Sequence, residues 1–574
     1  MKIKHLFGLA VIAAMTASCS SNEDLGTAGS GTGTNETGVG YATFTINLPS
    51  VSGTRAADAG GAEMDEGTAK EYAVKSATAL IFQKYGSDEG SCKFVESVDL
   101  PTAAADWTDD TTGGITTTSK KLVAKLTNVD TKNQYYVLVL LNNNKTGGVK
   151  VPLPTVGQSY NEWNSQILTP SVDDLAADND FYMANAPLKG TASPTTLVTI
   201  NKENIYSSKE KAEAGTSAAT VYVERGVAKM SVTDPTTKTV IDKATNTPTK
   251  STVEFNNWAL DITNRKTYAV HNIDGLSTDF PDIWTTPRFI GTNSRVYWGK
   301  DPNYNLDNLN TGKEAEREAE FNFIKATSGI NKTFTESAYC LENTFNLANM
   351  YQGQTTRVIF KATYTPMDGA GNSLAEPDGT FYTIGNMTTI LNETALETAV
   401  NTAATSVLPG CTVDYTNLKQ EGSHVITLAD IKDSTGTTLV ADKVYSGGKT
   451  GKEIVKEIND KLGLIDGAGH AEAMVGINTY AQGVTYYIAR VKHFGSLTPW
   501  NSGESYGTNN VKYLGRYGML RNNWYELTVG NVYGPGYPGV PPVDPNQPDD
   551  ENEKYLSVSV KILSWAKRSD TVDL

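Results

Sequence analysis

The chain has 574 residues, which is too many for one compact core and enough for two large domains. Its formal net charge of −15 argues against a general attraction to phosphate backbones, so we expect no nucleic-acid partner. Apolar stretches are short and alternating, and Gly, Thr, Asn and Ser are frequent. This composition predicts strands joined by turns rather than long helices.

The amino terminus has the pattern of an export signal. A basic start at residues 1–5 precedes an apolar run at 6–15 that is too short to cross a bilayer as a permanent helix. Small residues directly before Cys19 indicate a lipobox, in which this cysteine is lipidated and becomes the first residue after cleavage. The alternative is a plain secretory signal with an incidental cysteine. We expect the chain to reach the membrane only through this lipid.

Residues 41–48 predict one half-buried strand. Four apolar side chains alternate with polar ones along it: Ala42, Phe44, Ile46 and Leu48. The following stretch, 50–61, consists of small and flexible residues with a single basic residue, Arg55. A protease can reach the backbone of such a stretch, so the leading strand can be separated from the rest of the chain.

Further strands predict two β-rich regions. The first region holds candidate strands at 76–82, 121–126, 135–141 and 221–232. The polar repeat at 234–252 is expected to be a loop near the domain boundary. The second region holds candidate strands at 253–262, 355–363, 484–491 and 523–529, with helices expected at 313–325 and 452–462.

The chain ends with a second alternating strand. Residues 533–553 are rich in Pro, Gly, Asp and Asn and predict a linker that does not pack. Four apolar residues at a spacing of two follow it: Leu556, Val558, Val560 and Ile562. If the leading strand were cut away, the strand edges left behind would be a template for this last strand of a neighbouring copy. The alternative is that both segments are ordinary strands of their own domains.

Six stretches in chain order carry a family resemblance: residues 181–186, 222–229, 341–344, 520–527, 556–565 and 572–574. They are similar to segments of the Bacteroidales type V fimbrillins, in particular the shaft subunit of the minor fimbrium. The resemblance implies an all-β fold of two transthyretin-like β-sandwich domains, with a few short helices and a detachable C-terminal strand. It also implies lipidation of Cys19 and cleavage between Arg55 and Ala56 by an Arg-specific surface protease.

The resemblance further implies a division of the chain. We expect a signal peptide at 1–18, a lipidated propeptide with the removable strand at 19–55, sandwich domains at 56–236 and 237–533, a linker at 534–553 and a donor-strand region at 554–574. In the donor region Trp565, Val572 and Leu574 add to the four alternating residues. Either the stretch around 556–562 or the outer piece, 566–574, inserts into the neighbour.

Candidate motifs for catalysis and metal binding are incomplete in this sequence. His271, His424, His470 and His493 have no partners at metal-ligand spacing. The Gly-rich stretch 447–450 lacks the first glycine of a phosphate loop, and the stretch from Asp301 lacks the glycine of a calcium loop. We therefore expect no enzyme activity, cofactor or metal site. The remaining cysteines are expected to be small buried residues: Cys92, Cys340 and Cys411.

The function expected from these features is that of a structural subunit of a surface fimbrium. The precursor would be a lipoprotein anchored in the outer membrane, and the mature form would join other copies head to tail in extracellular filaments, with tip and anchor subunits. Receptors on host or bacterial surfaces would be further partners in adhesion and biofilm formation. The alternatives are a monomeric glycan-binding surface lipoprotein, whose aromatic residues stack on sugars, and a tip or accessory fimbrial subunit.

Overall fold

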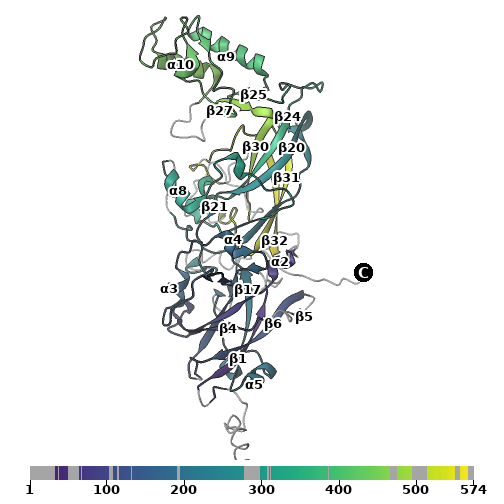
Figure 1. The fold of residues 1–574 in the computed structure, drawn as a ribbon, viewed down its shortest axis with the longest axis vertical. Coiled ribbons are helices and arrows are strands. Elements are labelled where there is room, and N and C mark those ends of the chain that lie inside the picture. Colours follow the sequence, from purple (N-terminus) through teal and green to yellow (C-terminus); the bar gives the residue numbers. More distant parts are fainter. Residues whose placement is uncertain are drawn as a thin grey trace, which may run out of the picture.

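We describe the protein from a computed structural model. The ranges it describes are 33–35, 38–48, 64–65, 67–102, 108–112, 115–130, 132–189, 194–276, 296, 298–306, 309, 312–385, 387–465, 475–493, 513–543, 545–549 and 556–565. The described molecule is elongated, with one large sheet at one end, a second large sheet in the middle and a pair of helices, α9 and α10, at the other end (Figure 1). The expected all-β fold with a few short helices is confirmed.

The first large sheet has ten strands. Its main path runs in the order β4 (Lys93–Leu100), β3 (Ala77–Gln83), β7 (Tyr135–Leu141), β12 (Met183–Asn185), β17 (Ala219–Arg225), β1 (Gly40–Asn47), β6 (Ile115–Leu126) and β5 (Thr108–Thr112). Two short strands lie off this path: β15 (Val198–Thr199) beside β7 and β16 (Ile205–Tyr206) beside β1.

This sheet curls around one apolar core, so that its distant strands approach each other. β4 lies close to β6, and the Glu96 carboxylate of β4 accepts hydrogen bonds from the backbone N–H groups of Thr127 and Asn128, just beyond β6. The continuous apolar run of β7 has no polar face, and all but one of its residues are buried. The predicted strand at 135–141 is therefore confirmed.

The second large sheet has nine strands. Its main path is β2 (Met64–Asp65), β32 (Leu556–Trp565), β31 (Asn523–Val532), β19 (Thr237–Asp242), β20 (Thr247–Asp261), β24 (Arg357–Thr365) and β30 (Val484–Arg490). β18 (Ala228–Val232) pairs with β31 and with β23 (Ala338–Cys340). A separate buried cluster fills this part of the molecule.

Two sequence predictions about the middle of the chain are wrong. The single strand expected at 221–232 is two strands, β17 and β18, which lie in different sheets. The crossing needs a close backbone approach, because a Cβ atom at Gly226 would meet the Tyr182 ring at 2.7 Å. The loop expected at 234–252 is largely the hairpin of β19 and β20, whose polar side chains face solvent while the backbone groups pair.

A smaller lobe is inserted between β24 and β30. It consists of the three-stranded sheet β25 (Phe381–Ile384), β29 (Ile477–Tyr480) and β27 (Gly422–His424), with α9 (Glu393–Val407) and α10 (Gly451–Leu462). It has a buried cluster of its own. α10 begins with a capping box of Thr450 and Glu453 and ends at Gly463 in the left-handed conformation, which confirms the helix predicted at 452–462.

The other α-helices of the described residues are short. They are α2 (Ala69–Tyr72), α3 (Tyr160–Asn164), α4 (Val172–Leu175), α5 (Lys209–Ala214) and α8 (Glu314–Glu320). The helix predicted at 313–325 ends early, because the chain becomes strand β22 at Phe321–Asn322 and pairs with β21 (Thr263–Asn264). The 15-residue helix α9 was not predicted at all.

Candidate functional site

The leading strand β1 is an interior strand of the first sheet. It pairs with β6 in antiparallel orientation along its whole length. On its other side it pairs with β17 in parallel orientation and with β16 at its start. Removal of β1 would therefore leave unpaired backbone groups on both neighbouring strands.

The inner face of β1 lies in the core. The side chains of Ala42, Phe44 and Ile46 have no solvent exposure, and that of Leu48 is 4% exposed. All four belong to the apolar cluster of the first sheet. The predicted alternation of the leading strand is thus found in the structure, with its apolar residues on the core side.

The outer face of β1 is covered as well, so the prediction of a half-buried strand is wrong. The short helix α5 lies against this face (Figure 1). The Thr43 hydroxyl donates a hydrogen bond to the backbone carbonyl of Ala212 in α5 (2.6 Å), and the hydroxyl groups of Thr45 and Ser217 form another (2.7 Å). The Asn47 amide donates to the carbonyl of Val221. The place of β1 in the sheet, which we call its seat, therefore has apolar positions on one face and positions for hydroxyl groups on the other.

The chain beyond Leu48 returns to the described part at β2. Residues 49–63, with the expected cleavage site at Arg55 and Ala56, lie outside the described residues, as does Cys19. β2 pairs in parallel with Ser564 and Trp565 of the last strand, β32. The chain after β2 is then fixed at α2, where the buried Glu71 carboxylate pairs with Lys229 (2.9 Å).

The tail strand β32 pairs with β31 of its own sheet in antiparallel orientation. Its backbone covers Leu556, Val558, Val560, Ile562 and Trp565, whereas Val572 and Leu574 lie outside the described residues. β1 and β32 thus lie in two different sheets of one molecule. Among the described residues, the two predicted segments do not pair with each other.

The linker before β32 packs against the second sheet, so the prediction that it cannot pack is wrong. The Arg357 guanidinium donates hydrogen bonds to the carbonyls of Pro541 and Pro542, and its Nε pairs with the buried carboxylate of Asp261. The Tyr487 hydroxyl donates to the carbonyl of Gly534. Proline removes a donor from the backbone but leaves the carbonyl as an acceptor, and side chains of the sheet use those carbonyls.

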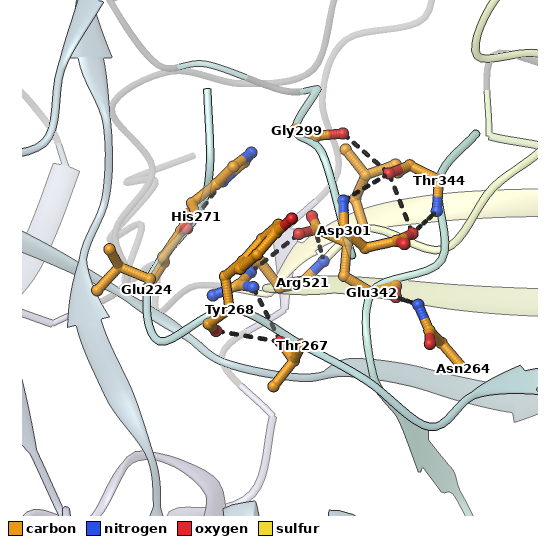
Figure 2. A network of polar contacts seen from close by, with 12 residues as sticks. Glu224, Asn264, Thr267, Tyr268, His271, Gly299, Asp301, Glu342, Thr344 and Arg521 are labelled. Atoms are coloured by element: carbon orange, nitrogen blue, oxygen red, sulfur yellow. Dashed lines mark hydrogen bonds and ion pairs between the residues drawn. The ribbon is translucent and has the colours of Figure 1, made fainter. Parts of the chain in front are cut away.

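A buried polar network joins the two large sheets (Figure 2). Glu224 at the end of β17 pairs with His271 at 2.9 Å, and both side chains are 3% exposed. Next to β31, the Nε of Arg521 pairs with the Glu342 carboxylate at 3.2 Å. Buried charges of this kind persist only when they are paired, so the network fixes how the strands beside β1 and β32 sit relative to one another.

Two groups of this network have shifted acidities. Burial raises the pKa of the Asp301 carboxyl to about 7, against hydrogen bonds from Thr344 and Asn303 that lower it. Burial lowers the pKa of His271, but the carboxylates of Glu224 and Glu342 raise it above its usual value. Burial and the structural partners of Asp301 and His271 explain both pKa shifts, so the shifts alone do not indicate a substrate site.

The described histidines and cysteines have ordinary structural surroundings. Among the described residues no group of three His, Cys, Asp or Glu side chains could hold a metal ion. His424 contacts a backbone carbonyl and His493 contacts the Tyr525 hydroxyl, whereas His470 lies outside the described part. The three cysteines of the described chain are free and buried, as predicted: Cys92, Cys340 and Cys411. Within the described ranges, no helix combines the length and apolar character that crossing a membrane requires.

The end of the chain matches a known family. Residues 478–571, from β29 through β32 and beyond, match the family described as major fimbrial subunit protein type IV, Fimbrillin, C-terminal. The carboxy-terminal region of this chain is thus similar to the C-terminal part of fimbrillins. The predicted resemblance to fimbrillins is thus confirmed, and it includes both the packed linker and the tail strand β32.

Solved structures give only distant likenesses to this chain. A proposed cell adhesion protein from Parabacteroides distasonis has 10% identity and a TM-score of 0.34, over 92% of this chain and 97% of that chain. A fimbrial assembly protein from the same organism has 11% identity and a TM-score of 0.27, over 61% and 93%. The tip fimbrial protein Mfa3 from Porphyromonas gingivalis has 10% identity and a TM-score of 0.29, over 92% and 100%. These scores are too low to carry an argument, and no curated protein matches the sequence.

One part of the site was missed by sequence reasoning. The seat for the hydroxyl groups of Thr43 and Thr45 depends on α5 and on Ser217, more than 160 residues away along the chain. A signal for α5 exists, because Ser208 caps a run of helix-forming residues at Lys209–Ala214. Nothing in the sequence places that helix over β1.

Proposed function

We propose that this chain is a shaft subunit of a surface fimbrium and polymerises by protease-triggered strand exchange. The precursor is lipidated at Cys19 and held at the outer membrane. An Arg-specific protease cuts between Arg55 and Ala56, β1 leaves, and the tail of a second copy takes its place. The role is structural rather than catalytic, in support of adhesion and biofilm formation.

The observation that carries this proposal is the position of β1. An interior strand normally belongs permanently to its fold, yet β1 is the first described strand of the chain and is joined to the remainder only through residues 49–63. A single cut in that stretch makes β1 a separate peptide. What it leaves is a groove with two unpaired strand edges, which is a strong template for another strand.

The apolar contacts explain why cleavage and replacement must be coupled. Burial of Phe44, Ile46 and Leu48 contributes roughly 1.5–3 kcal/mol for each side chain, and ladder hydrogen bonds add to this. An empty groove would expose the same apolar area to water. A cut β1 therefore remains bound until a strand of similar pattern displaces it, which limits assembly to copies that carry such a tail.

The positions of the two segments are also compatible with a filament. The groove lies in the first sheet and the tail lies in the second, so the contact between two copies joins different surfaces. Such a head-to-tail contact repeats without closing and generates a fibre. Tip and anchor subunits would end this series, and receptors on other surfaces would bind the finished fimbrium.

The test is the substitution Arg55→Ala in the full-length chain. We expect the variant to remain a soluble, unassembled precursor after treatment with an Arg-specific protease, whereas the wild-type chain forms ladders of polymers on size-exclusion chromatography and filaments in electron micrographs. Asp58→Ala in the same stretch is the matched control and should assemble normally.

Two outcomes would contradict the proposal. If Arg55→Ala built normal filaments, assembly would not depend on the cut. If the cleaved wild-type protein stayed monomeric, a monomeric surface lipoprotein that binds glycans would be the better explanation.

A further inference from the structure

We propose that residues 555–562 of a second copy replace residues 41–48 position by position, and that α5 and Ser217 select this register through two hydroxyl groups. This inference rests on the proposed strand exchange. It identifies the part of the tail that enters the neighbour and the contacts by which the groove distinguishes it from other segments.

The seat of β1 sets a requirement at each position. Four places on the inner face need apolar side chains, since Ala42, Phe44, Ile46 and Leu48 are at most 4% exposed. Two places on the outer face hold hydroxyl groups that form hydrogen bonds, at Thr43 and Thr45. The carbonyl of Ala212 would lose its side-chain donor if an apolar residue stood in the place of Thr43.

The segment 555–562 meets these requirements in one register. Tyr555 falls on Tyr41, and Ser557 and Ser559 fall on the two threonines. The four apolar places are taken, in order, by Leu556, Val558, Val560 and Ile562. Leucine in place of Ala42 and valine in place of Phe44 exchange a small and a large residue at neighbouring places of one face, so the total volume changes little.

Neighbouring registers do not meet these requirements. A shift of one residue turns every apolar side chain to the outer face. A shift of two residues toward the end of the chain puts Leu563 in the buried, polar place of Asn47 and Ser564 in the buried, apolar place of Leu48. A shift of two residues the other way puts Lys554 in the fully buried place of Ala42.

The outer piece of the tail fails for a different reason. Residues 567–574 can place Ser569 and Thr571 at the two hydroxyl positions, with Val572 and Leu574 at two of the apolar ones. The same register puts Arg568 in the place of Ala42 and Asp570 in the place of Phe44, both without solvent exposure in β1. Burial of an unpaired charge in either place is far more unfavourable than the hydrogen bond of one hydroxyl group is favourable.

The backbone favours the transfer as well. In its own subunit β32 pairs along its length with β31, and among the described residues its other side meets only the two-residue strand β2. In the groove the same segment would have β6 on one side and β16 and β17 on the other. One mismatch remains, since Lys561 takes the place of Asn47, which is buried at the end of the strand.

Thiol cross-linking between full-length copies tests the register. Lys121 of β6 lies opposite Thr45, and both positions are on the outer face. In the uncut precursor, Thr45→Cys with Lys121→Cys should give an intramolecular cross-link with a short reagent, which serves as the positive control. A chain without introduced cysteines measures the background, since Cys92, Cys340 and Cys411 are buried.

In the test itself, a Lys121→Cys copy is mixed with a copy that carries one cysteine in its tail, and both are cut with an Arg-specific protease. We expect a covalent dimer with Ser559→Cys and little with Ser557→Cys, since two residues along a strand are about 7 Å apart. A dimer with Thr571→Cys instead would overturn the inference in favour of the outer piece. If the cut wild-type chain forms no polymer at all, the proposed function itself fails.

A second pair of variants tests the hydroxyl groups. Ser557→Ala with Ser559→Ala should reduce the yield of polymer about tenfold, because two hydrogen bonds in the groove are lost. Ser557→Thr with Ser559→Thr should assemble like the wild type, since threonine restores the groups that β1 itself carries. Equal assembly of the alanine and threonine variants would show that the hydroxyl groups do not select the donor, and thermal unfolding of both monomers controls for effects on β32 in its own sheet.

Discussion

The first and last described strands of this chain share an alternating sequence but have different neighbours. β1 has long strands on both sides, a core on its inner face and a helix on its outer face. β32 has one long neighbour, β31, and among the described residues only the short β2 on its other side. The segment that precedes the expected cut is therefore the enclosed one, and the expected donor lies nearer to an edge.

Under the proposed strand exchange, this difference indicates which event would control assembly. An edge strand can leave and return by itself, since it breaks few contacts on its open side. An enclosed strand leaves only when its connection is cut and a replacement arrives. Under the proposed strand exchange, the order of cut, displacement and refilling would follow from the unequal enclosure of two similar strands, and an uncut precursor would stay unassembled.

The substitution Phe44→Ala should have the largest effect on stability and tests this comparison most directly. In the uncut precursor we expect a loss of about 3–5 kcal/mol in the free energy of unfolding, because Phe44 has no solvent exposure and its removal leaves a cavity in the core. In assembled filaments the same substitution should have no effect, because β1 has left. Denaturant unfolding of the precursor and of disassembled filaments measures both.

The control for this substitution is Val156→Ala, at a position that is 78% exposed, which should change stability by no more than about 0.5 kcal/mol. Equal loss of stability from Phe44→Ala before and after assembly would mean that β1 stays in the fold, and the comparison between the two strands would lose its functional meaning.

Within the polar network between the neighbours of β1 and β32, the Asp301 carboxyl alone predicts a pH effect on stability of at most about 4 kcal/mol. The Asp301 carboxyl has a pKa of about 7 in the fold, against 3.8 as its ordinary value. A raised pKa means that the folded state holds a proton that the unfolded chain releases. This contribution is complete below pH 4 and is lost as the pH rises through about 7. Burial raises the pKa of Glu89 to about 7 and acts in the same direction.

Unfolding of the precursor between pH 4 and pH 8 measures this effect. Asp301→Asn should flatten the slope of stability against pH, whatever it does to stability at a single pH. Hydrogen exchange should also show that β17 and β31 respond together, because the network ties both strands. A slope that is unchanged in Asp301→Asn would remove Asp301 as the source of the effect.

Sequence patterns predicted the segments whose side chains alternate or are uniformly apolar. The strand at 135–141 and the apolar face of residues 41–48 are examples, since burial of side chains alone decides their conformation. The hairpin of β19 and β20 escaped prediction because its strands are polar on most positions and are held by backbone pairing. The packed linker escaped for a similar reason, since its contacts depend on Arg357 and Tyr487 from distant strands.

The candidate site divides in the same way. The sequence predicted which residues of β1 face the core, because an apolar period of two is visible locally. It did not predict the cover on the outer face, because α5 is brought there by the order of strands in the sheet, with β16 before it and β17 after it. Thr43 and Thr45 therefore had the pattern of solvent-facing residues although their hydroxyl groups are bound.

The smallest expected effect is also the most specific. Thr43→Ala removes the donor of the hydrogen bond to the Ala212 carbonyl in a place that is 2% exposed, and we expect a loss of about 1 kcal/mol in the stability of the precursor. Thr43→Ser keeps the hydroxyl group and should recover most of this loss. Because a weaker bound β1 is displaced more readily, Thr43→Ala should also speed polymer formation after the cut, whereas Thr43→Ser should not. Slower assembly of Thr43→Ala would mean that departure of β1 does not limit the exchange, and that entry of the tail does.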